Sequence, residues 1–225
     1  MKLLIVGYGK MGRLVEQMAV EQGHEVTGRI DVDSAGSDSA WSLPADVAID
    51  FSTADALKAN FPRYIARKLP VVIGTTGWDV DRDACRAEAE RAGIGVVAAA
   101  NFSIGVNLFE LIVAEAARLM QPQPQFGAWI HESHHAAKRD APSGTALLLR
   151  DAMTRAGYRS PIDVSSTRAG AIPGIHTIGF DAASDTIELT HTARDRRGFA
   201  AGAIVAAQFV RERRGWFTMA DVLRG

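Results

Sequence analysis

The sequence predicts an α/β protein in two parts: a parallel sheet covered on both faces by helices, and a second, α+β domain with a mixed sheet. Two observations lead to this prediction. Short apolar runs alternate with helical patterns up to about residue 100, whereas the later strand-like segments are longer and follow a change of texture after Asn101. Of the 225 residues, 47% are apolar, which is enough for the core of one large or two modest domains.

Repeated strand and helix units define the first domain. The expected strands lie at residues 3–6, 26–31, 47–51, 71–73 and 96–99. A helix that ends near residue 22 and helices at about 54–67 and 80–92 separate them. Strands joined through helices in this way form a parallel sheet with both faces buried.

The second domain begins with the apolar helix "GVNLFELIVAEAARLM", which leads through "QPQPQ" to the strand-like segments "FGAWIHES", "GIHTIGF" and "TIELTHTA". These segments predict a mixed or antiparallel sheet. The later helix "FAAGAIVAAQFVRER" has an Ala-rich face that we expect to pack back on the first sheet. We therefore expect one domain from residues 1–103 plus 197–225, and another from 104–196.

Composition narrows the class of partner. The chain has 25 Lys and Arg against 26 Asp and Glu, which predicts no strong charge field for nucleic acid or an acidic membrane surface. Its single cysteine, Cys85, excludes an internal disulfide and a Cys-based zinc site. No stretch has the ~18 apolar residues of a membrane span, and the short apolar N-terminus does not fit a signal peptide. We expect a cytoplasmic protein that binds a small molecule.

A glycine pattern follows the first strand in "LLIVGYGKMGRLVEQMA". Gly7 permits a tight turn, Gly9 lets the backbone approach a pyrophosphate, and Gly12 allows close packing of helix on strand. The N–H groups at the start of the helix attract an anion. This pattern predicts a Rossmann dinucleotide-binding domain, with the cofactor over Gly7, Tyr8, Gly9, Lys10, Met11 and Gly12.

The end of the second strand bears on cofactor choice. Asp31 lies nineteen positions after Gly12, where an acid is expected to bind the adenosine ribose hydroxyls. The acid favours NADH, whereas the nearby Arg29 would still tolerate NADPH. The sequence leaves this choice open.

Two further turns follow buried strands and therefore lie at the ligand-binding edge of the sheet. The first contains Gly74, Thr75 and Thr76 in "VVIGTTGW", and the second contains Asn101 in "VVAAANFS". One interpretation places them around the nicotinamide. In the other, the first turn caps a helix and Asn101 satisfies local backbone groups.

The run "HESHHAAKRDAPSGTA", residues 131–146, begins with letters that fit the H-E-x-x-H pattern of zinc hydrolases. Two such histidines share a metal only on a helix, where residues four apart are neighbours. The preceding "QFGAWI" predicts a strand, on which positions four apart are ~13 Å apart. We therefore expect no metal here.

On a strand, Glu132 and His134 point to one face and His131 and Ser133 to the other. Ser143 is expected to cap the helix that follows. The N–H groups of Gly144 and Thr145, together with the hydroxyls, then form a pocket for a carboxylate or phosphate. With His134, His135 and Lys138 close by in sequence, the run predicts a site that binds an acidic substrate and supplies protons.

The same run resembles the signature of the 4-hydroxy-tetrahydrodipicolinate reductase family, also called dihydrodipicolinate reductases. Its pattern H-H-x-x-K-x-D-x-P-S-G-T is matched residue by residue from His134 to Thr145. The likeness extends over "GYGKMG", "DFSTADAL", "VIGTTGW", "AANFSIGVN", "IPGIHTIGF", "IELTHTARDRRGFAAGA" and "FTMADVL", which span nearly the whole chain.

The resemblance implies an NADH- or NADPH-dependent reductase of the diaminopimelate route to lysine, with a dicarboxylate substrate. It implies a homotetramer built through the sheets of the second domain, which would be the substrate-binding domain. It assigns proton donation to His134 and Lys138. The further residues that it implies at the substrate are His135, Ser143, Gly144, Thr145 and Arg196. Arg194 and Arg197 are alternatives to Arg196 for the same role. The residues that it implies at the cofactor are Asp31, Gly74, Thr75, Thr76, Ala99, Ala100, Asn101 and Phe102.

Three other functions stay open on the residues alone. The first is another two-domain Rossmann dehydrogenase, and the second is a dinucleotide sensor without catalysis. The third is the zinc hydrolase, which a chelator would test.

Overall fold

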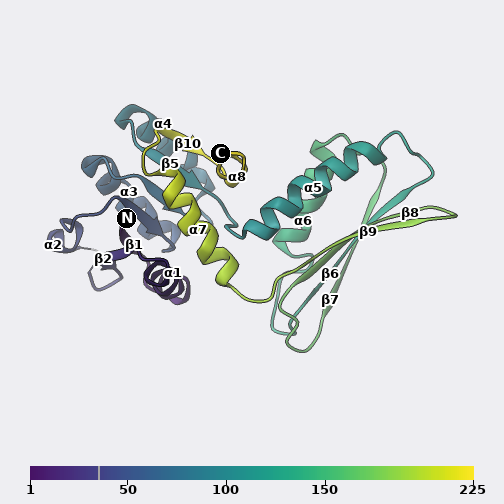
Figure 1. The fold of residues 1–225 in the computed structure, drawn as a ribbon, viewed down its shortest axis with the longest axis horizontal. Coiled ribbons are helices and arrows are strands. Elements are labelled where there is room, and N and C mark those ends of the chain that lie inside the picture. The colour runs from purple at the N-terminus through teal and green to yellow at the C-terminus, as the bar shows by residue number, and fades with distance from the viewer. Residues whose placement is uncertain (35) are drawn as a thin grey trace. The chain divides into compact units, whose positions relative to one another are not determined.

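The computed structural model describes residues 1–34 and 36–225, and the chain divides into two compact units (Figure 1). Unit 1 comprises Met1–Ile104 and Arg197–Gly225, and unit 2 comprises Gly105–Arg196. Unit 1 contains a parallel sheet and unit 2 a mixed sheet, so the predicted α/β class is confirmed.

The sheet of unit 1 has six parallel strands. Its order is β10-β5-β4-β3-β1-β2. From β1 the chain adds β2 on one side and then crosses to add β3, β4 and β5 on the other side, so the strand order reverses between β1 and β3, which are neighbours. Ligands of open α/β sheets bind beyond the carboxyl ends of the strands at such a point. The strands are β1 (Lys2–Val6), β2 (Glu25–Ile30), β3 (Val47–Asp50), β4 (Val71–Ile73), β5 (Gly95–Ala98) and β10 (Gly215–Phe217).

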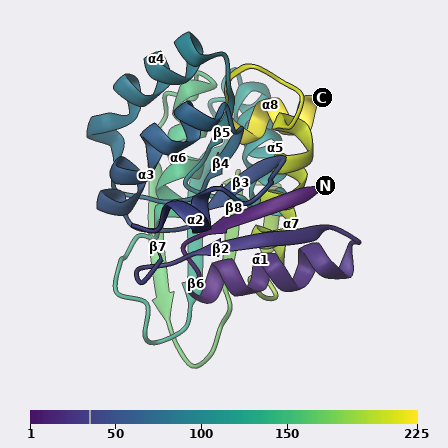
Figure 2. The same ribbon diagram turned by 90° about the vertical axis from the view of Figure 1, so that its left-hand side faces the viewer.

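Helices cover both faces of this sheet, which explains why its inner strands are almost continuously apolar (Figure 2). The helices that pack on one face are α1 (Lys10–Glu21), α7 (Arg197–Val210) and α8 (Met219–Arg224). Those on the other face are α2 (Asp38–Trp41), α3 (Ala54–Arg67) and α4 (Arg82–Ala92), the last preceded by a 3₁₀ turn, η1 (Asp79–Asp81).

Helix α7, which follows unit 2 in sequence, packs on the first sheet, as its small residues predict. Ala200, Ala203 and Ala207 are fully buried in the core beside the strands. A Cβ atom at Gly202 would lie 1.7 Å from the carbonyl oxygen of Phe102, so the helix approaches the loop after β5 more closely than any side chain would allow.

The sheet of unit 2 has the order β7-β6-β8-β9. Its strands are β6 (Gly127–His134), β7 (Ile162–Arg168), β8 (Ile175–Asp181) and β9 (Thr186–Thr192). β6 and β7 run parallel and are connected through α6 (Gly144–Arg155), whereas the β6–β8 and β8–β9 pairs are antiparallel. The sequence did not predict β7 because "IDVSSTR" is largely exposed and polar.

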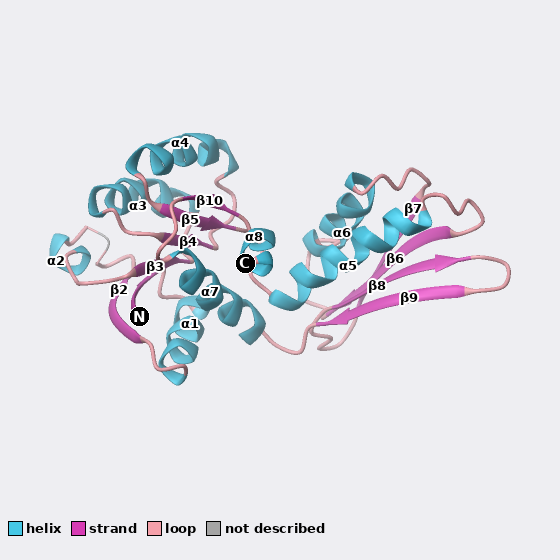
Figure 3. Cartoon of the chain, turned by 45° about the horizontal axis from the view of Figure 1, so that its top comes forward, coloured by secondary structure: helices cyan, strands magenta, loops and turns pink. Residues whose placement is uncertain are grey.

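Helices α5 (Ile104–Met120) and α6 cover one face of this sheet (Figure 3). Along β6 the residues alternate, so that Ala128, Ile130, Glu132 and His134 are buried while the residues between them are half-buried. The alternation places two ionisable groups at the end of an apolar row, on the face that carries the core.

Across the two described ranges, 1–34 and 36–225, none of the helices has both the length and the apolar character needed to cross a membrane.

Candidate functional site

A cavity of about 240 Å³ lies at the carboxyl edge of the unit 1 sheet, where β1 and β3 are neighbours. Four residues predicted at the cofactor line it: Gly7, Tyr8, Gly9 and Asp31. Lys10, Met11 and Gly12 instead form the first turn of α1. Further lining residues are Val6, Ile30, Val32, Phe51, Ser52, Thr53, Ala56 and Asn60.

The glycines at this cavity have the conformations that a pyrophosphate cradle requires. Gly7 has a φ of +82°, which a residue with a side chain rarely adopts. Gly9 is the N-cap of α1 without a side-chain cap, and a Cβ atom built on it would meet nothing within 4 Å. A Cβ atom on Gly12 would lie 2.2 Å from the carbonyl oxygen of Gly7. The space beside Gly9 and the helix N-terminus therefore fit a dinucleotide.

Two glycine variants separate binding from folding. We expect Gly9→Ala to fold normally, because its Cβ meets no protein atom, but to lose affinity for the reduced cofactor, because the methyl group enters the space beside the helix N-terminus. Gly12→Ala should lower the free energy of unfolding, since backbone must move to admit the methyl group. Thermal unfolding and cofactor titration of both variants test this pair; equal stability losses would contradict it.

Arg29 does not point freely into the cavity. Its guanidinium forms an ion pair with Glu16, in which Nε donates to Oε2 at 2.9 Å. It also lies over the ring of Tyr8, 5.6 Å from the centroid. The hydrogen bond from Arg29 lowers the pKa of Glu16. Asp31 is exposed at the cavity, and none of the described residues that line the cavity is Lys or Arg.

The loops after β4 and β5 approach this region through Phe51. A Cβ atom on Gly74 would lie 2.1 Å from the Phe51 ring, and the Phe51 and Phe102 rings meet edge to face with centroids 5.9 Å apart. Thr75 is buried and Thr76 exposed. Asn101 Oδ1 accepts a hydrogen bond from Ser103 N at 2.8 Å, a contact with a local backbone group of the kind that one interpretation of the sequence described. Ala99 is half-buried and Ala100 exposed.

Phe51, Ser52 and Thr53 line the cavity, yet we did not predict them at the cofactor. They follow β3 directly, so the argument that placed the loops after β4 and β5 at the ligand-binding edge applies to them equally.

In unit 2, residues 131–134 lie on strand β6, as the sequence predicts. The side chain of His131 contacts hydroxyls on Ser165 and Ser133, at 2.9 and 3.1 Å. His135 follows the strand. The two histidines of the H-E-x-x-H letters therefore lack the helix on which they would share a metal.

Glu132 and His134 form a buried pair at the end of β6. Glu132 Oε2 contacts His134 Nδ1, and the other carboxylate oxygen accepts hydrogen bonds from Arg168 Nη2 at 2.6 Å and from Ser143 N at 3.3 Å. Glu132 is fully buried, and the His134 residue is 9% exposed. Because Nδ1 of His134 contacts Glu132, Nε2 is the ring nitrogen that remains available to another hydrogen-bond partner.

The charges around this pair set its protonation. Burial raises the pKa of Glu132, but hydrogen bonds from Arg168 and Ser166 and the charges of His134 and Arg168 outweigh it and lower that pKa to about 2. Burial lowers the pKa of His134 below its ordinary value of 6.5; Glu132 opposes this shift, and the charges of Lys138 and Arg168 add to it. Glu132 is therefore a carboxylate at neutral pH, and His134 is largely neutral in the free protein.

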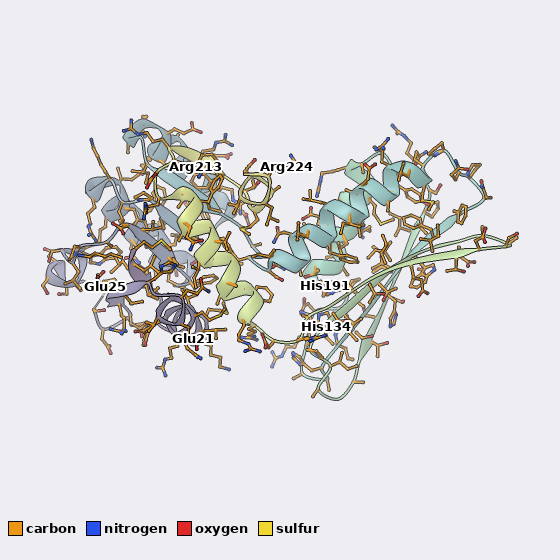
Figure 4. The ribbon with its side chains drawn as sticks, viewed as in Figure 1. Glu21, Glu25, His134, His191, Arg213 and Arg224 are labelled. Atoms are coloured by element: carbon orange, nitrogen blue, oxygen red, sulfur yellow. The ribbon has the colours of Figure 1, made fainter. Side chains whose placement is uncertain are left out.

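His176, on β8, completes this cluster. Its Nε2 is 3.1 Å from Ser143 Oγ, and its ring meets that of His134 edge to face with centroids 5.1 Å apart. Burial, followed by the charge of His134, lowers the pKa of His176 to about 4, so it is neutral. His191, on β9, pairs with His176 across the strands, and Figure 4 shows His134 and His191 at the same end of the sheet.

The N-terminus of α6 lies beside these groups. Ser143 caps the helix as predicted, since its Oγ accepts a hydrogen bond from Ala146 N at 3.2 Å. Its hydroxyl is buried and engaged by Ala146 and His176, which leaves the half-buried Thr145 and the exposed Gly144 as the accessible part of the turn.

Lys138 lies in the loop between β6 and α6. Its Nζ donates to both carboxylate oxygens of Asp140, at 2.8 and 2.9 Å. Hydrogen bonding from Lys138 lowers the pKa of Asp140. Arg194 and Arg196 lie in the turn before α7, and Arg197 is the first residue of that helix; all three are exposed, so exposure does not separate them.

Glu132, His134 and His176 each offer a ligand atom, and these atoms lie within 4.8 Å of one another, a spacing that a metal ion could bridge. The set differs from the pair His131 and His135 that the sequence raised. Arg168 already neutralises Glu132 from 2.6 Å, and an added dication would be repelled by this guanidinium.

A glycine-lined cavity at the carboxyl edge of a parallel sheet in one unit and, in the other, a histidine paired with a buried carboxylate are typical of a Rossmann-type oxidoreductase. Models of the N-terminal and C-terminal parts of dihydrodipicolinate reductase match residues 1–102 and 105–223. The chain belongs to the dihydrodipicolinate reductase family.

Similar proteins agree over nearly the whole length. The 4-hydroxy-tetrahydrodipicolinate reductase of Christiangramia forsetii is 35% identical, with 99% of this chain and 98% of the relative covered. That of Archaeoglobus fulgidus is also 35% identical, with 96% of each covered. A dipicolinate-bound dihydrodipicolinate reductase from Paenisporosarcina sp. TG-14 shares the fold, with a TM-score of 0.79, 22% identity, and 96% and 97% coverage.

These findings confirm the resemblance drawn from the sequence. The chain is an NADH- or NADPH-dependent oxidoreductase of a family that serves diaminopimelate and lysine biosynthesis. Another two-domain Rossmann dehydrogenase or a dinucleotide sensor would not explain why models of this one reductase family match both units.

Proposed function

We propose that this protein reduces 4-hydroxy-tetrahydrodipicolinate to tetrahydrodipicolinate with loss of water, using the histidine and lysine at the end of β6. The observation that carries the proposal is the buried Glu132–His134 pair next to Lys138 and the N-terminus of α6. In this proposal unit 1 binds the cofactor and unit 2 the substrate.

The cofactor, when bound, supplies a hydride to a ring carbon of the substrate. That transfer pushes electron density toward the ring nitrogen and a neighbouring carbon, which must be protonated. Nε2 of His134 is suited to deliver this proton, because Glu132 fixes the ring through Nδ1 and stabilises the imidazolium. The substrate carboxylates add negative charge near His134, which raises its pKa when the substrate binds.

Lys138 has two roles in the proposal. Its ammonium places positive charge beside the developing negative charge. In the loss of water that precedes hydride transfer, it donates a proton to the departing hydroxyl group while the adjacent ring carbon gives up a proton to solvent, so that a C=C bond conjugated with the ring imine is left to accept the hydride. Asp140 holds the ammonium in the free protein, and a substrate carboxylate would compete for the same donor.

The substrate carboxylates would bind at the start of α6, through the N–H groups of Gly144 and Thr145, the Thr145 hydroxyl and His135. Ser143 would contribute by capping the helix and holding His176 rather than through a free hydroxyl. Arg196 is proposed as a further cation for a carboxylate. This arrangement follows the general affinity of helix N-termini for anions.

Thr145→Ala tests the carboxylate pocket. We expect the KM for substrate to rise about tenfold, the equivalent of ~1.4 kcal/mol, with kcat largely retained, because the hydroxyl holds the substrate but moves no proton. Steady-state kinetics check the split; a loss confined to kcat would contradict this role.

The pH profile reports the protonation of His134. The imidazolium is the form that donates the proton, and the pKa of His134 lies below 6.5 in the free protein. We therefore expect kcat/KM to decrease as the pH rises through this lowered pKa. Glu132→Gln removes the charge that opposes the lowering and leaves Arg168 uncompensated. The decrease should therefore start at a lower pH in this variant; an unchanged profile would contradict the pairing.

At the cofactor, we propose that Gly7 to Gly12 bind the pyrophosphate, Asp31 the ribose, and the loops containing Gly74–Thr76 and Ala99–Phe102 the nicotinamide. The cavity beside Gly7, Gly9 and Asp31 and the contacts of Phe51 with both loops support this arrangement.

We also propose a cytoplasmic homotetramer assembled through the sheets of unit 2. The helices of unit 2 cover one face of its sheet, and the other face carries half-buried side chains such as Trp129, His131 and Ser133. A face of this kind is suited to pair with another copy of the chain.

The function is tested by adding freshly generated 4-hydroxy-tetrahydrodipicolinate to protein and reduced cofactor, and following cofactor absorbance. We expect oxidation that depends on the substrate. Cofactor binding without oxidation would instead identify a sensor, and oxidation only with other carbonyl compounds, such as 2-oxo acids with ammonia or oxidised sugars, would identify a different dehydrogenase. Activity that disappears with a chelator and returns with zinc would indicate a metal enzyme.

A further inference from the structure

The carboxyl group of Asp50 is buried in unit 1 and has no part in the proposed chemistry. Asp50, the last residue of β3, has no exposed surface. Burial raises the pKa of its carboxyl group, although hydrogen bonds from Ser52, Tyr64 and Thr75 oppose the shift. Burying a carboxyl group costs free energy of folding unless hydrogen-bond donors surround its oxygens, so the surroundings of Asp50 have to explain its presence here.

The reason lies in the four hydrogen bonds that Asp50 accepts. Oδ1 accepts from the backbone N of Ser52 at 2.9 Å, from its hydroxyl at 2.6 Å, and from the hydroxyl of Thr75 at 3.0 Å. Oδ2 accepts from the hydroxyl of Tyr64, on helix α3, at 2.7 Å. Oδ1 therefore holds two loops together, whereas Oδ2 faces the apolar core around α3.

The loops joined by Oδ1 belong to the cofactor cavity. Ser52 and Thr53 line it beside Gly7 and Gly9. A Cβ atom on Gly7 would lie 2.5 Å from the carbonyl carbon of Phe51, so the glycine loop rests directly on the segment that Asp50 fixes. Thr75 lies in the next loop, which begins with Gly74 packed on the Phe51 ring.

We propose that Asp50 is a positioning residue of the cofactor site, which holds the loops after β3 and β4 in the shape that receives NADH or NADPH. It acts through Ser52 and Thr75 and does not itself touch the cofactor. A carboxylate suits this position because its neighbours all donate to it: Oδ1 accepts three of the bonds, and the amide nitrogen of an asparagine could not accept the fourth, from Tyr64.

Three variants test the proposal by calorimetric titration of reduced cofactor in the absence of substrate, which keeps it separate from the substrate chemistry. Asp50→Ala should raise the Kd about tenfold, the equivalent of ~1.4 kcal/mol. Asp50→Asn should raise it less, because its oxygen can keep some of the bonds to Ser52 and Thr75. Tyr64→Phe is the matched control: it removes a hydrogen bond from the same carboxylate but on the core side, so Kd should stay at the wild-type value while the unfolding temperature falls.

Steady-state kinetics give a second readout, in which the Asp50 variants should raise the KM for cofactor more than they lower kcat. If Asp50→Ala does not fold, Asp50→Asn and Tyr64→Phe decide the matter. Wild-type Kd in the Asp50 variants would overturn the proposal. So would an equal rise in Kd for Tyr64→Phe, since that would indicate a general loss of stability.

Discussion

His134→Ala should lower kcat by ~10²–10⁴-fold, the range that a positioned general acid contributes. The proton that follows hydride transfer then has to come from water, because Glu132 is buried, ionised and bound to Arg168. The KM for cofactor should change little, since His134 lies in unit 2 and the cofactor cavity in unit 1. Steady-state kinetics at saturating substrate measure the effect.

The control for this variant is His24→Ala. His24 is a half-buried histidine in unit 1 that bonds to Gln208, so the change removes an imidazole without altering unit 2. Its kcat should equal that of the wild type. A His134→Ala enzyme with wild-type kcat would show that His134 is not the proton donor.

Lys138→Ala should lower kcat by ~10²-fold or more, because both a proton donor and a positive charge are lost at the reacting ring. Lys138 lies in the loop between β6 and α6 and does not belong to the hydrophobic core of unit 2, so the fold should persist. Asp140 also loses its ammonium partner and its charge then faces the incoming substrate carboxylate, so the KM for substrate should increase as well.

Arg139→Ala provides the comparison, because it removes an exposed cation from the neighbouring position. If the effect of Lys138 were only a diffuse attraction for a dianion, the two variants would raise KM alike and leave kcat unchanged. A large decrease in kcat confined to Lys138→Ala supports the assigned role.

The fold could be predicted from sequence wherever apolar periodicity was strong. The inner strands of unit 1 are buried on both faces, so they appear in the sequence as apolar runs, for example at residues 3–6 and 71–73. Strand β7 was not predicted, because it is a largely exposed edge strand in which only Ile162 and Val164 alternate as apolar residues and the remaining five residues are polar. The short strand β10 has three residues and is fixed by its pairing with β5 rather than by a pattern of its own.

The same contrast holds for the sites. The glycine loop and the run from His134 to Thr145 are local in sequence, so their spacing indicated the chemistry. Arg168 and His176 contact Glu132 and His134 only because β7 and β8 flank β6. Asp50 likewise reaches Thr75 across two strands, 25 positions apart in sequence. Partners brought together by strand pairing leave no spacing for a sequence pattern to report.

The most direct test of the central claim is the mass of tetrahydrodipicolinate formed with reduced cofactor that carries deuterium at the transferred position. The account predicts one deuterium per product molecule, with one cofactor oxidised for each substrate consumed. Oxidation of the cofactor without deuterium in the product, or no oxidation in the presence of fresh substrate, would contradict it.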